Sequence, residues 1–171
     1  MNKQTNIHIR IPQAGDGAGL AHTWFDTAKY YVELNPELFQ LPDMDGLAQW
    51  CEEWAVTQPS EDTFLRVAEH NDQVIGFIGA AIQLPMTDGH RQFVRDMNVK
   101  RLMIDALVVQ QVYWRHGVGR QLMKAAEQWG RSQGAVIALL DTYISSPVSV
   151  SFYEQQMGYQ RRALHFRKVL A

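Results

Sequence analysis

The chain has 171 residues, and we expect residues 1–171 to form a single domain around one core. Apolar residues make up 46% and charged residues 20%, which excludes a largely disordered protein. The formal net charge of -2 argues against general binding to nucleic acid or to an anionic membrane surface. A polar N-terminus and the absence of a long apolar run lead us to expect a cytoplasmic protein.

The N-terminal half alternates between strand and helix patterns. Isoleucines at every second position predict a short strand over residues 7–11. Apolar residues at spacings of three and four predict helices over 20–34 and 44–57. Two further strands are predicted over 64–69 and 74–83. The residues between these two strands have turn composition, so we expect an antiparallel hairpin.

The C-terminal half continues this alternation after an irregular stretch. Strands are predicted over residues 100–109, 135–142 and 159–169, and helices are predicted between them over 117–133 and 147–156. A helix that joins two parallel strands forms a right-handed crossover, whereas the earlier strands can pair by hairpins. The sequence therefore predicts an α+β fold with a mixed sheet and helices on its faces.

One strand-to-helix junction carries the strongest chemical signal. The apolar strand Leu107–Val109 leads into a loop with Gly117 and Gly119 that opens an amphipathic helix. The first amides of a helix have no partner within it, and glycines let an anion approach the backbone. Arg115 and Arg120 add positive charge. The pattern predicts a phosphate-binding loop, with a plain glycine-capped turn as the alternative; a Walker loop and a dinucleotide fingerprint lack their required residues.

This junction resembles the coenzyme A-binding motif of the GNAT superfamily of N-acetyltransferases. That motif is Arg/Gln-x-x-Gly-x-Gly/Ala, preceded by a Leu-x-Val strand and often by a tyrosine. Leu107-Val108-Val109 matches the strand, Tyr113 the tyrosine, and Gly117-Val118-Gly119 the glycine loop. Trp114 stands where the motif has arginine or glutamine, and Arg115 follows it with a positive charge.

Other parts of the chain resemble the same superfamily in the same order. Residues 140–142 resemble its late strand, and residues 151–159 resemble its Phe-Tyr-Glu helix and closing glycine. The tyrosine-to-glycine spacing in the second run is one residue longer than the pattern. Ser145 or Ser146 replaces the asparagine that often precedes this helix. Residues 32–39 resemble the end of its N-terminal helix, and residues 64–76 resemble its central strands, so the resemblance covers nearly the whole chain.

The resemblance implies a GNAT-like fold with a mixed, largely antiparallel sheet and a parallel β-α-β unit that binds acetyl-CoA. It implies transfer of the acetyl group to a primary amine, which attacks the thioester directly in a ternary complex. The residues that the resemblance assigns to coenzyme binding are Leu107, Val108, Val109, Trp114, Arg115, His116, Gly117, Val118, Gly119, Arg120 and Ser146.

Two residues are catalytic candidates. The resemblance makes Tyr153 the acid that protonates the departing thiolate, because a phenol is protonated at neutral pH. An alkylammonium must lose a proton before it attacks, and Asp105 is the first candidate to accept that proton. Glu69 and Asp141 are further candidates. The alternatives are a packing role for Tyr153 and structural or solvated roles for the carboxylates.

The acceptor is expected to be a small-molecule or peptide amine. Histidine spacing typical of metal ligands is absent, so we expect no metal. Homodimers are common in the superfamily, and the resemblance carries that expectation here. A non-catalytic coenzyme A-binding or regulatory module with this fold is the alternative function. A transferase that uses another acyl-CoA is a further alternative.

Overall fold

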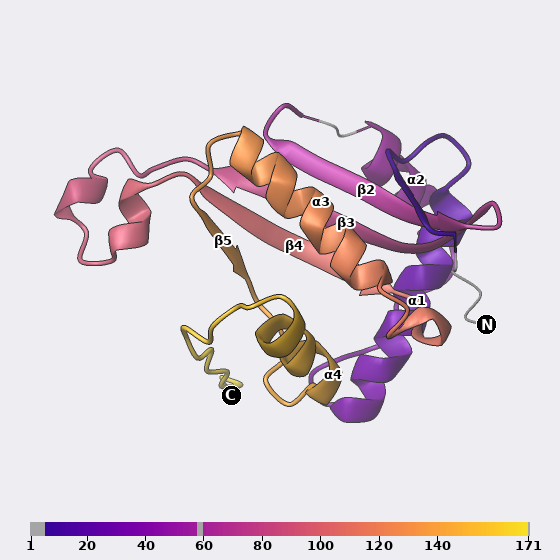
Figure 1. Cartoon of the computed structure of the whole chain (residues 1–171). Helices are drawn as coiled ribbons and strands as arrows, with labels where there is room; N and C mark the ends of the chain where they lie inside the picture. Colours follow the sequence, from indigo (N-terminus) through magenta and orange to yellow (C-terminus); the bar gives the residue numbers. More distant parts are fainter. Residues whose placement is uncertain (1–5, 58–59, 171) are drawn as a thin grey trace. The chain divides into compact units, whose positions relative to one another are not determined.

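A computed structural model describes residues 6–57 and 60–170. The chain divides into two compact units, Met1–Asp141 and Thr142–Ala171, and each is described separately. The first unit contains a five-stranded sheet with strand order β1-β2-β3-β4-β5 (Figure 1). Its strands are β1 (His8–Arg10), β2 (Thr63–His70), β3 (Gln73–Gln83), β4 (Arg101–Val109) and β5 (Ile137–Leu140).

The sheet is mixed, as the sequence predicts. Strands β1 to β4 pair antiparallel with their neighbours, whereas β4 and β5 run parallel. The predicted hairpin joins β2 to β3 through Asn71 and Asp72, whose φ angles are 50° and 58°. Two left-handed residues at such a turn match the right-handed twist of the flanking strands.

Strand β4 has an irregularity near its middle and an unpaired side beyond it. Gly79 pairs with Ala106 and Ala80 pairs with Ile104, so Asp105 is an extra residue in a β-bulge. Pairing between β4 and β5 covers only Arg101 to Ile104 on β4. Beyond that point β5 diverges from β4 (Figure 1). Residues 105–109 therefore have no described strand on their β5 side.

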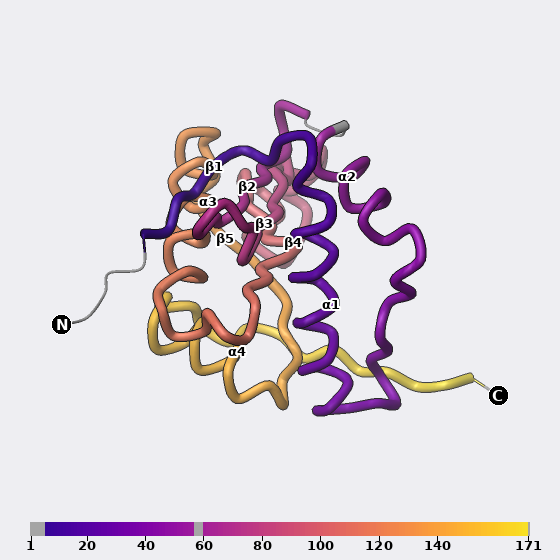
Figure 2. Tube along the Cα trace, turned by 90° about the vertical axis from the view of Figure 1, so that its right-hand side faces the viewer, coloured from indigo at the N-terminus to yellow at the C-terminus, as the bar shows by residue number. Residues whose placement is uncertain are grey.

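Helices cover both faces of the sheet. Helices α1 (Gly17–Leu34) and α2 (Leu47–Thr57) lie on one face, and α3 (Val118–Ser132) lies on the other (Figure 2). The α1–α2 face holds a buried apolar cluster that includes Leu20, Phe77 and Val108. Cys51, the single cysteine of the chain, belongs to this cluster.

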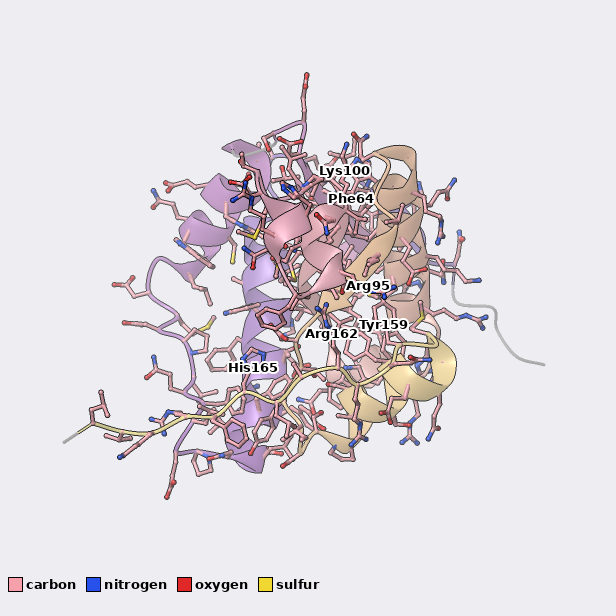
Figure 3. All side chains as sticks on the ribbon, turned by 90° about the vertical axis from the view of Figure 1, so that its left-hand side faces the viewer. Phe64, Arg95, Lys100, Tyr159, Arg162 and His165 are labelled. Atoms are coloured by element: carbon pink, nitrogen blue, oxygen red, sulfur yellow. The ribbon has the colours of Figure 1, made fainter. Side chains whose placement is uncertain are left out.

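The C-terminal end of α3 is fixed to the sheet by two contacts at one end of the unit (Figure 3). The ring of Phe64 on β2 stacks on Trp129 with a centroid distance of 5.2 Å. The Lys100 ammonium donates to the carbonyl oxygen of Gln133 over 2.8 Å. The other end of α3, where the helix starts, therefore lies next to the C-terminal end of β4.

The connection between β3 and β4 differs from the irregular stretch that the sequence predicts. It contains two short 3₁₀ turns, Gly89–Arg91 and Arg95–Asn98. The backbone amide of Met86 donates to the carbonyl oxygen of Met97, which joins the two limbs of the connection. Figure 1 shows this connection extending beyond the end of the sheet.

The second unit begins with the short helix α4 (Pro147–Ser151), which continues into a wider π-helical turn (Phe152–Gln156). In this turn the Met157 amide donates to the carbonyl oxygen of Phe152, five residues earlier. A π-turn accommodates one residue more than an α-turn. It therefore accounts for the long spacing between Tyr153 and Gly158. The single regular helix predicted over 147–156 is correspondingly wrong in its second half.

The strand predicted over residues 159–169 is also wrong. Residues 160–170 have no helix or strand structure. Leu164 and Phe166 are 65% and 93% exposed, so the alternating apolar pattern faces solvent. A strand requires a neighbour that completes its hydrogen bonds, and the described chain supplies no ladder for this segment.

Candidate functional site

The loop between β4 and α3 contains two residues in the left-handed region of backbone space. Arg115 has a φ of 64° and Gly117 has a φ of 82°, whereas His116 between them has a negative φ. Alternation of this kind turns successive amides toward one point and forms a concave anion site. The space beside Gly117 is open, because a Cβ built there meets no atom within 4 Å. The loop therefore leaves room for a ligand against the backbone.

The start of α3 adds further donors to this loop. The first hydrogen bond from α3 to its cap runs from the Gln121 amide to the Gly117 carbonyl over 3.1 Å. The amides of Val118, Gly119 and Arg120 precede it, and no acceptor for them is recorded among the described residues. Arg115 and Arg120 are both exposed. Unpaired amides, the helix dipole and two guanidinium groups together fit a diphosphate.

The unpaired side of β4 presents backbone groups next to this loop. The Gln110 amide donates to the Ile75 carbonyl over 2.9 Å, and Val108 pairs opposite Phe77. Because antiparallel strands alternate inward and outward groups, the amide and carbonyl groups of Leu107 and Val109 face away from β3. An extended ligand with amide groups could therefore pair along this side as an added strand.

Trp114 forms a hydrogen bond with one of these outward-facing groups, the Val109 carbonyl. Its indole Nε1–H donates to the Val109 carbonyl oxygen over 2.7 Å. His116 lies near the same turn, with its Nδ1 atom 2.9 Å from the Trp114 carbonyl oxygen. Leu107 therefore offers a free amide and carbonyl on the unpaired side, whereas the Val109 carbonyl already accepts one hydrogen bond.

Helix α1 supports the loop through contacts that sequence reasoning missed. The Gln111 amide donates to the Asp26 carboxylate over 2.7 Å, and the Gln111 side chain donates to the Asp26 carbonyl over 2.9 Å. The Gln110 side chain donates to the Thr23 hydroxyl over 3.1 Å. Asp26 and Gln111 are 85 residues apart, so no local pattern indicates that they meet.

Asp105 lies at the bulge of β4, where the alternation of the strand changes phase. Before the bulge Leu102 packs against Gly130 of α3, and directly after it Ala106 packs against the α1–α2 cluster. The Asp105 side chain keeps exposed surface, yet burial by the surrounding protein raises the pKa of its carboxyl above the usual value. A raised pKa brings a carboxylate closer to the range in which it accepts protons at neutral pH.

The other carboxylate candidates differ from Asp105 in their surroundings. The Glu69 carboxylate accepts a hydrogen bond from Arg10 Nε over 2.6 Å. Arg10 also forms an ion pair with Asp16, so Glu69 belongs to a structural network between β1, β2 and the start of α1. Asp141 directly follows β5 at the end of the first unit. Asp105 therefore remains the stronger candidate base.

Tyr153 and Ser146 belong to the second unit. The Tyr153 ring contacts Phe152 and Tyr159 at centroid distances of 5.2 and 6.0 Å. Ser146 caps α4, because its hydroxyl oxygen accepts a hydrogen bond from the Ser149 amide over 3.2 Å. This capping role is one that the sequence did not assign to Ser146. Glu154 and Arg161 form an exposed ion pair, in which Arg161 lowers the pKa of the Glu154 carboxyl.

Within the described ranges, no group of three histidine, cysteine or acidic side chains has the arrangement of a metal site. None of the helices in those ranges combines the length and apolar character needed to span a membrane.

The sheet with one unpaired strand side and the anion-binding turn before α3 together define a β-α-β unit suited to a phosphorylated, strand-like cosubstrate.

Comparison with known proteins places this unit in a family. The profile of the acetyltransferase (GNAT) family matches residues 23–159, and the chain belongs to that family. The chain is 30% identical over 100 residues to N-acetyltransferase 8 of Homo sapiens. That match covers 58% of this chain and 40% of the relative, so the chain spans less than half of the relative's length.

Solved structures share the fold at lower identity. A transcriptional regulator from Bacillus halodurans C-125 has a TM-score of 0.69 at 18% identity, over 96% of this chain and 100% of that one. AAC(6')-Iy, solved with the bisubstrate analogue CoA-S-monomethyl-acetylneamine, has a TM-score of 0.62 at 18% identity, over 96% and 99%. An aminoglycoside acetyltransferase from an uncultured soil metagenomic sample has a TM-score of 0.61 at 15% identity, over 96% and 97%. At these identities the likeness establishes the fold.

Proposed function

We propose that the protein is an N-acetyltransferase that moves the acetyl group of acetyl-CoA to a primary amine. One observation carries the proposal: a turn with two left-handed residues leads into α3 directly beside the unpaired side of β4. Membership of the acetyltransferase family supports it, as does the coenzyme A analogue bound to a protein of the same fold.

Coenzyme binding would use the two features together. The diphosphate would accept hydrogen bonds from the amides of residues 117–120, with Arg115 and Arg120 balancing its charge. The pantetheine arm would pair along β4 between Leu107 and Val109, mainly through the Leu107 amide and carbonyl. This arrangement binds the coenzyme largely through backbone, so the glycine conformation matters more than any single side chain.

The proposed reaction is a direct transfer. The amine nitrogen attacks the thioester carbonyl carbon, the C–N bond forms, and the C–S bond then breaks. A backbone amide at Val109 would stabilise the oxyanion that forms in between. The ammonium first gives one proton to Asp105, directly or through water. After the attack, the Tyr153 hydroxyl protonates the departing thiolate, and the second proton lost by the nitrogen restores the phenol. The Tyr153 and Asp105 roles rest on the family motif and on the raised Asp105 pKa respectively.

The acceptor class is a small-molecule or peptide amine. Proteins of the same fold include acetyltransferases named for aminoglycosides, which supports a screen that begins with small polyamino compounds. A second candidate function is a non-catalytic coenzyme A-binding module, since one protein of this fold is named as a transcriptional regulator. The use of another acyl-CoA is tested by repeating the assay below with other acyl-CoA donors in place of acetyl-CoA.

A thiol-release assay tests the proposal. Wild-type protein is incubated with acetyl-CoA and a panel of aminoglycosides, polyamines, amino acids and peptides, with Tyr153→Phe as the matched variant. We expect amine-dependent release of coenzyme A, and a kcat about 10- to 100-fold lower in Tyr153→Phe. Coenzyme A binding without turnover of any amine would contradict the enzyme and favour the non-catalytic module.

A further inference from the structure

Trp114 replaces the arginine or glutamine of the motif with a side chain that points back to the sheet. We infer that Trp114 is a positioning residue, which holds the coenzyme loop against the end of β4 through the Val109 carbonyl. The inference rests on the proposed function. Its basis is the 2.7 Å hydrogen bond from the indole Nε1–H to the Val109 carbonyl oxygen.

The hydrogen bond joins two residues five positions apart and so closes a short loop of the chain. Val109 is the last residue of β4, and Trp114 follows the 3₁₀ turn Gln111–Tyr113. Arg115, the first left-handed residue of the loop, comes directly after Trp114. Fixing Trp114 to Val109 therefore fixes where the backbone enters the anion-binding turn. An arginine or glutamine at this position could also donate to that carbonyl, but on a more flexible side chain.

Helix α1 holds the other side of the indole. The Tyr30 ring meets the Trp114 ring edge-to-face, with centroids 4.9 Å apart and planes at 87°. Asp26, one helical turn earlier, accepts the Gln111 amide. Because residues four apart lie on the same side of a helix, Asp26 and Tyr30 form one support for the loop. The loop is thus held between α1 and the end of β4.

The position of Trp114 also limits how the coenzyme pairs with β4. The Val109 carbonyl oxygen already accepts the indole N–H, which leaves one of its two lone pairs for a pantetheine amide. The pairing of the cosubstrate would then depend mainly on Leu107. Loss of the indole N–H would release the Val109 carbonyl and loosen the loop. It should therefore weaken coenzyme binding without removing any group that touches the reacting atoms.

Matched variants separate positioning from packing. Trp114→Phe keeps an aromatic ring beside Tyr30 but removes the N–H donor. Trp114→Gln restores an N–H donor and matches the residue that the motif allows. Trp129→Phe is the control, because Trp129 stacks on Phe64 at the far end of α3. Asp26→Ala and Asp26→Asn test the same loop from α1, since asparagine retains an oxygen that accepts the Gln111 amide.

The readouts are the Kd for coenzyme A, the KM for acetyl-CoA, kcat, and stability to urea. We expect Trp114→Phe to raise Kd and KM together by about 5- to 10-fold, the loss of one hydrogen bond, with kcat within about two-fold. Trp114→Gln should recover most of this loss, and Trp129→Phe should leave Kd unchanged. Asp26→Ala should weaken binding similarly, and Asp26→Asn should recover it.

Indole NMR signals provide a readout that packing alone would not change. The five tryptophans give five indole N–H signals, and Trp114→Phe identifies the one from Trp114. Coenzyme A should shift that signal and leave the Trp129 signal in place. Folded Trp114→Phe that binds coenzyme A as tightly as wild type would overturn this inference alone. If Trp114→Phe does not fold, unchanged binding by Asp26→Ala would overturn it. Failure of wild type to bind would overturn the proposed function itself.

Discussion

At the scale of single residues, Arg115 shows how the site uses an unfavourable backbone conformation. Its φ of 64° lies in the left-handed region, which costs a non-glycine residue about 1 kcal/mol. We expect both the charge of Arg115 and the conformation of the turn to serve the anion site. The residue is exposed, so its side chain has no core to stabilise it.

Arg115→Gly and Arg115→Ala test this view as a pair. Both variants lose the charge, but only glycine relieves the left-handed strain. We expect Arg115→Gly to be more stable than Arg115→Ala by about 1 kcal/mol in urea unfolding. Both should bind coenzyme A more weakly than wild type, and the difference from wild type should shrink at high salt. Equal stability of the two variants would contradict the strain.

Asp105 and Asp16 should respond to pH in opposite directions. Burial raises the pKa of the Asp105 carboxyl above its usual 3.8, so the folded protein binds this proton more tightly than the unfolded chain does. The associated stability is present below about pH 4 and is lost as pH rises through the raised pKa. We expect Asp105→Asn to remove this loss, measured by urea unfolding between pH 4 and 7. An unchanged pH profile would contradict the raised pKa.

For Asp16 the sign is reversed. Burial alone would raise the pKa of its carboxyl, but hydrogen bonds from Arg10 and the Gln13 amide lower it below the usual 3.8. Its stabilising contribution is therefore present above about pH 4 and is lost as pH falls through the lowered pKa. Asp16→Asn should be less stable at pH 7 by about 1–2 kcal/mol and should lose less stability on acidification. Acid unfolding curves that match wild type would exclude this role.

At the scale of secondary structure elements, strand β3 contains two glycines, Gly76 and Gly79, whose surroundings differ. A Cβ at Gly76 would lie 2.9 Å from the Val108 carbonyl oxygen of β4 and 3.4 Å from Leu122 of α3. A Cβ at Gly79 would lie 3.6 Å from Trp54 of α2, an ordinary contact distance. Gly76 therefore sets how closely β3, β4 and α3 approach, next to the unpaired side of β4.

Alanine substitutions at these two glycines form a matched test. Gly76→Ala should destabilise the protein by about 1–3 kcal/mol, because backbone rather than a flexible side chain must move. Gly79→Ala should change stability by less than about 1 kcal/mol. Thermal or urea unfolding of both variants provides the comparison. Equal effects would mean that the approach of β4 and α3 does not limit residue 76.

The elements also show what the sequence could and could not predict. The strand Leu107–Val109 and the glycine loop were predictable, because both depend on residues that are neighbours in the chain. The contact between Asp26 and Gln111 was not, because it joins residues 85 positions apart. The alternation near Phe166 suggested a strand, but alternation does not supply the neighbour that a strand needs. The π-helical turn Phe152–Gln156 appeared in the sequence only as one extra residue between Tyr153 and Gly158.

At the scale of the whole molecule, the family assignment and the proposed chemistry rest on different kinds of observation. The family profile covers residues 23–159, which includes both the coenzyme loop and Tyr153. The loop belongs to the first compact unit and Tyr153 to the second. Binding of the coenzyme therefore tests the loop in the first unit, and turnover by Tyr153→Phe tests the role proposed for a residue of the second unit.

The central claim is that the turn before α3 binds the diphosphate of coenzyme A. Isothermal titration of acetyl-CoA into the wild type, Tyr153→Phe and a Gly117→Asp/Gly119→Asp double variant tests it most directly. We predict binding in the micromolar range by the first two proteins and none by the double variant, which places two carboxylates at the turn. Absence of binding by folded wild type, or unchanged binding by a folded double variant, would contradict the claim.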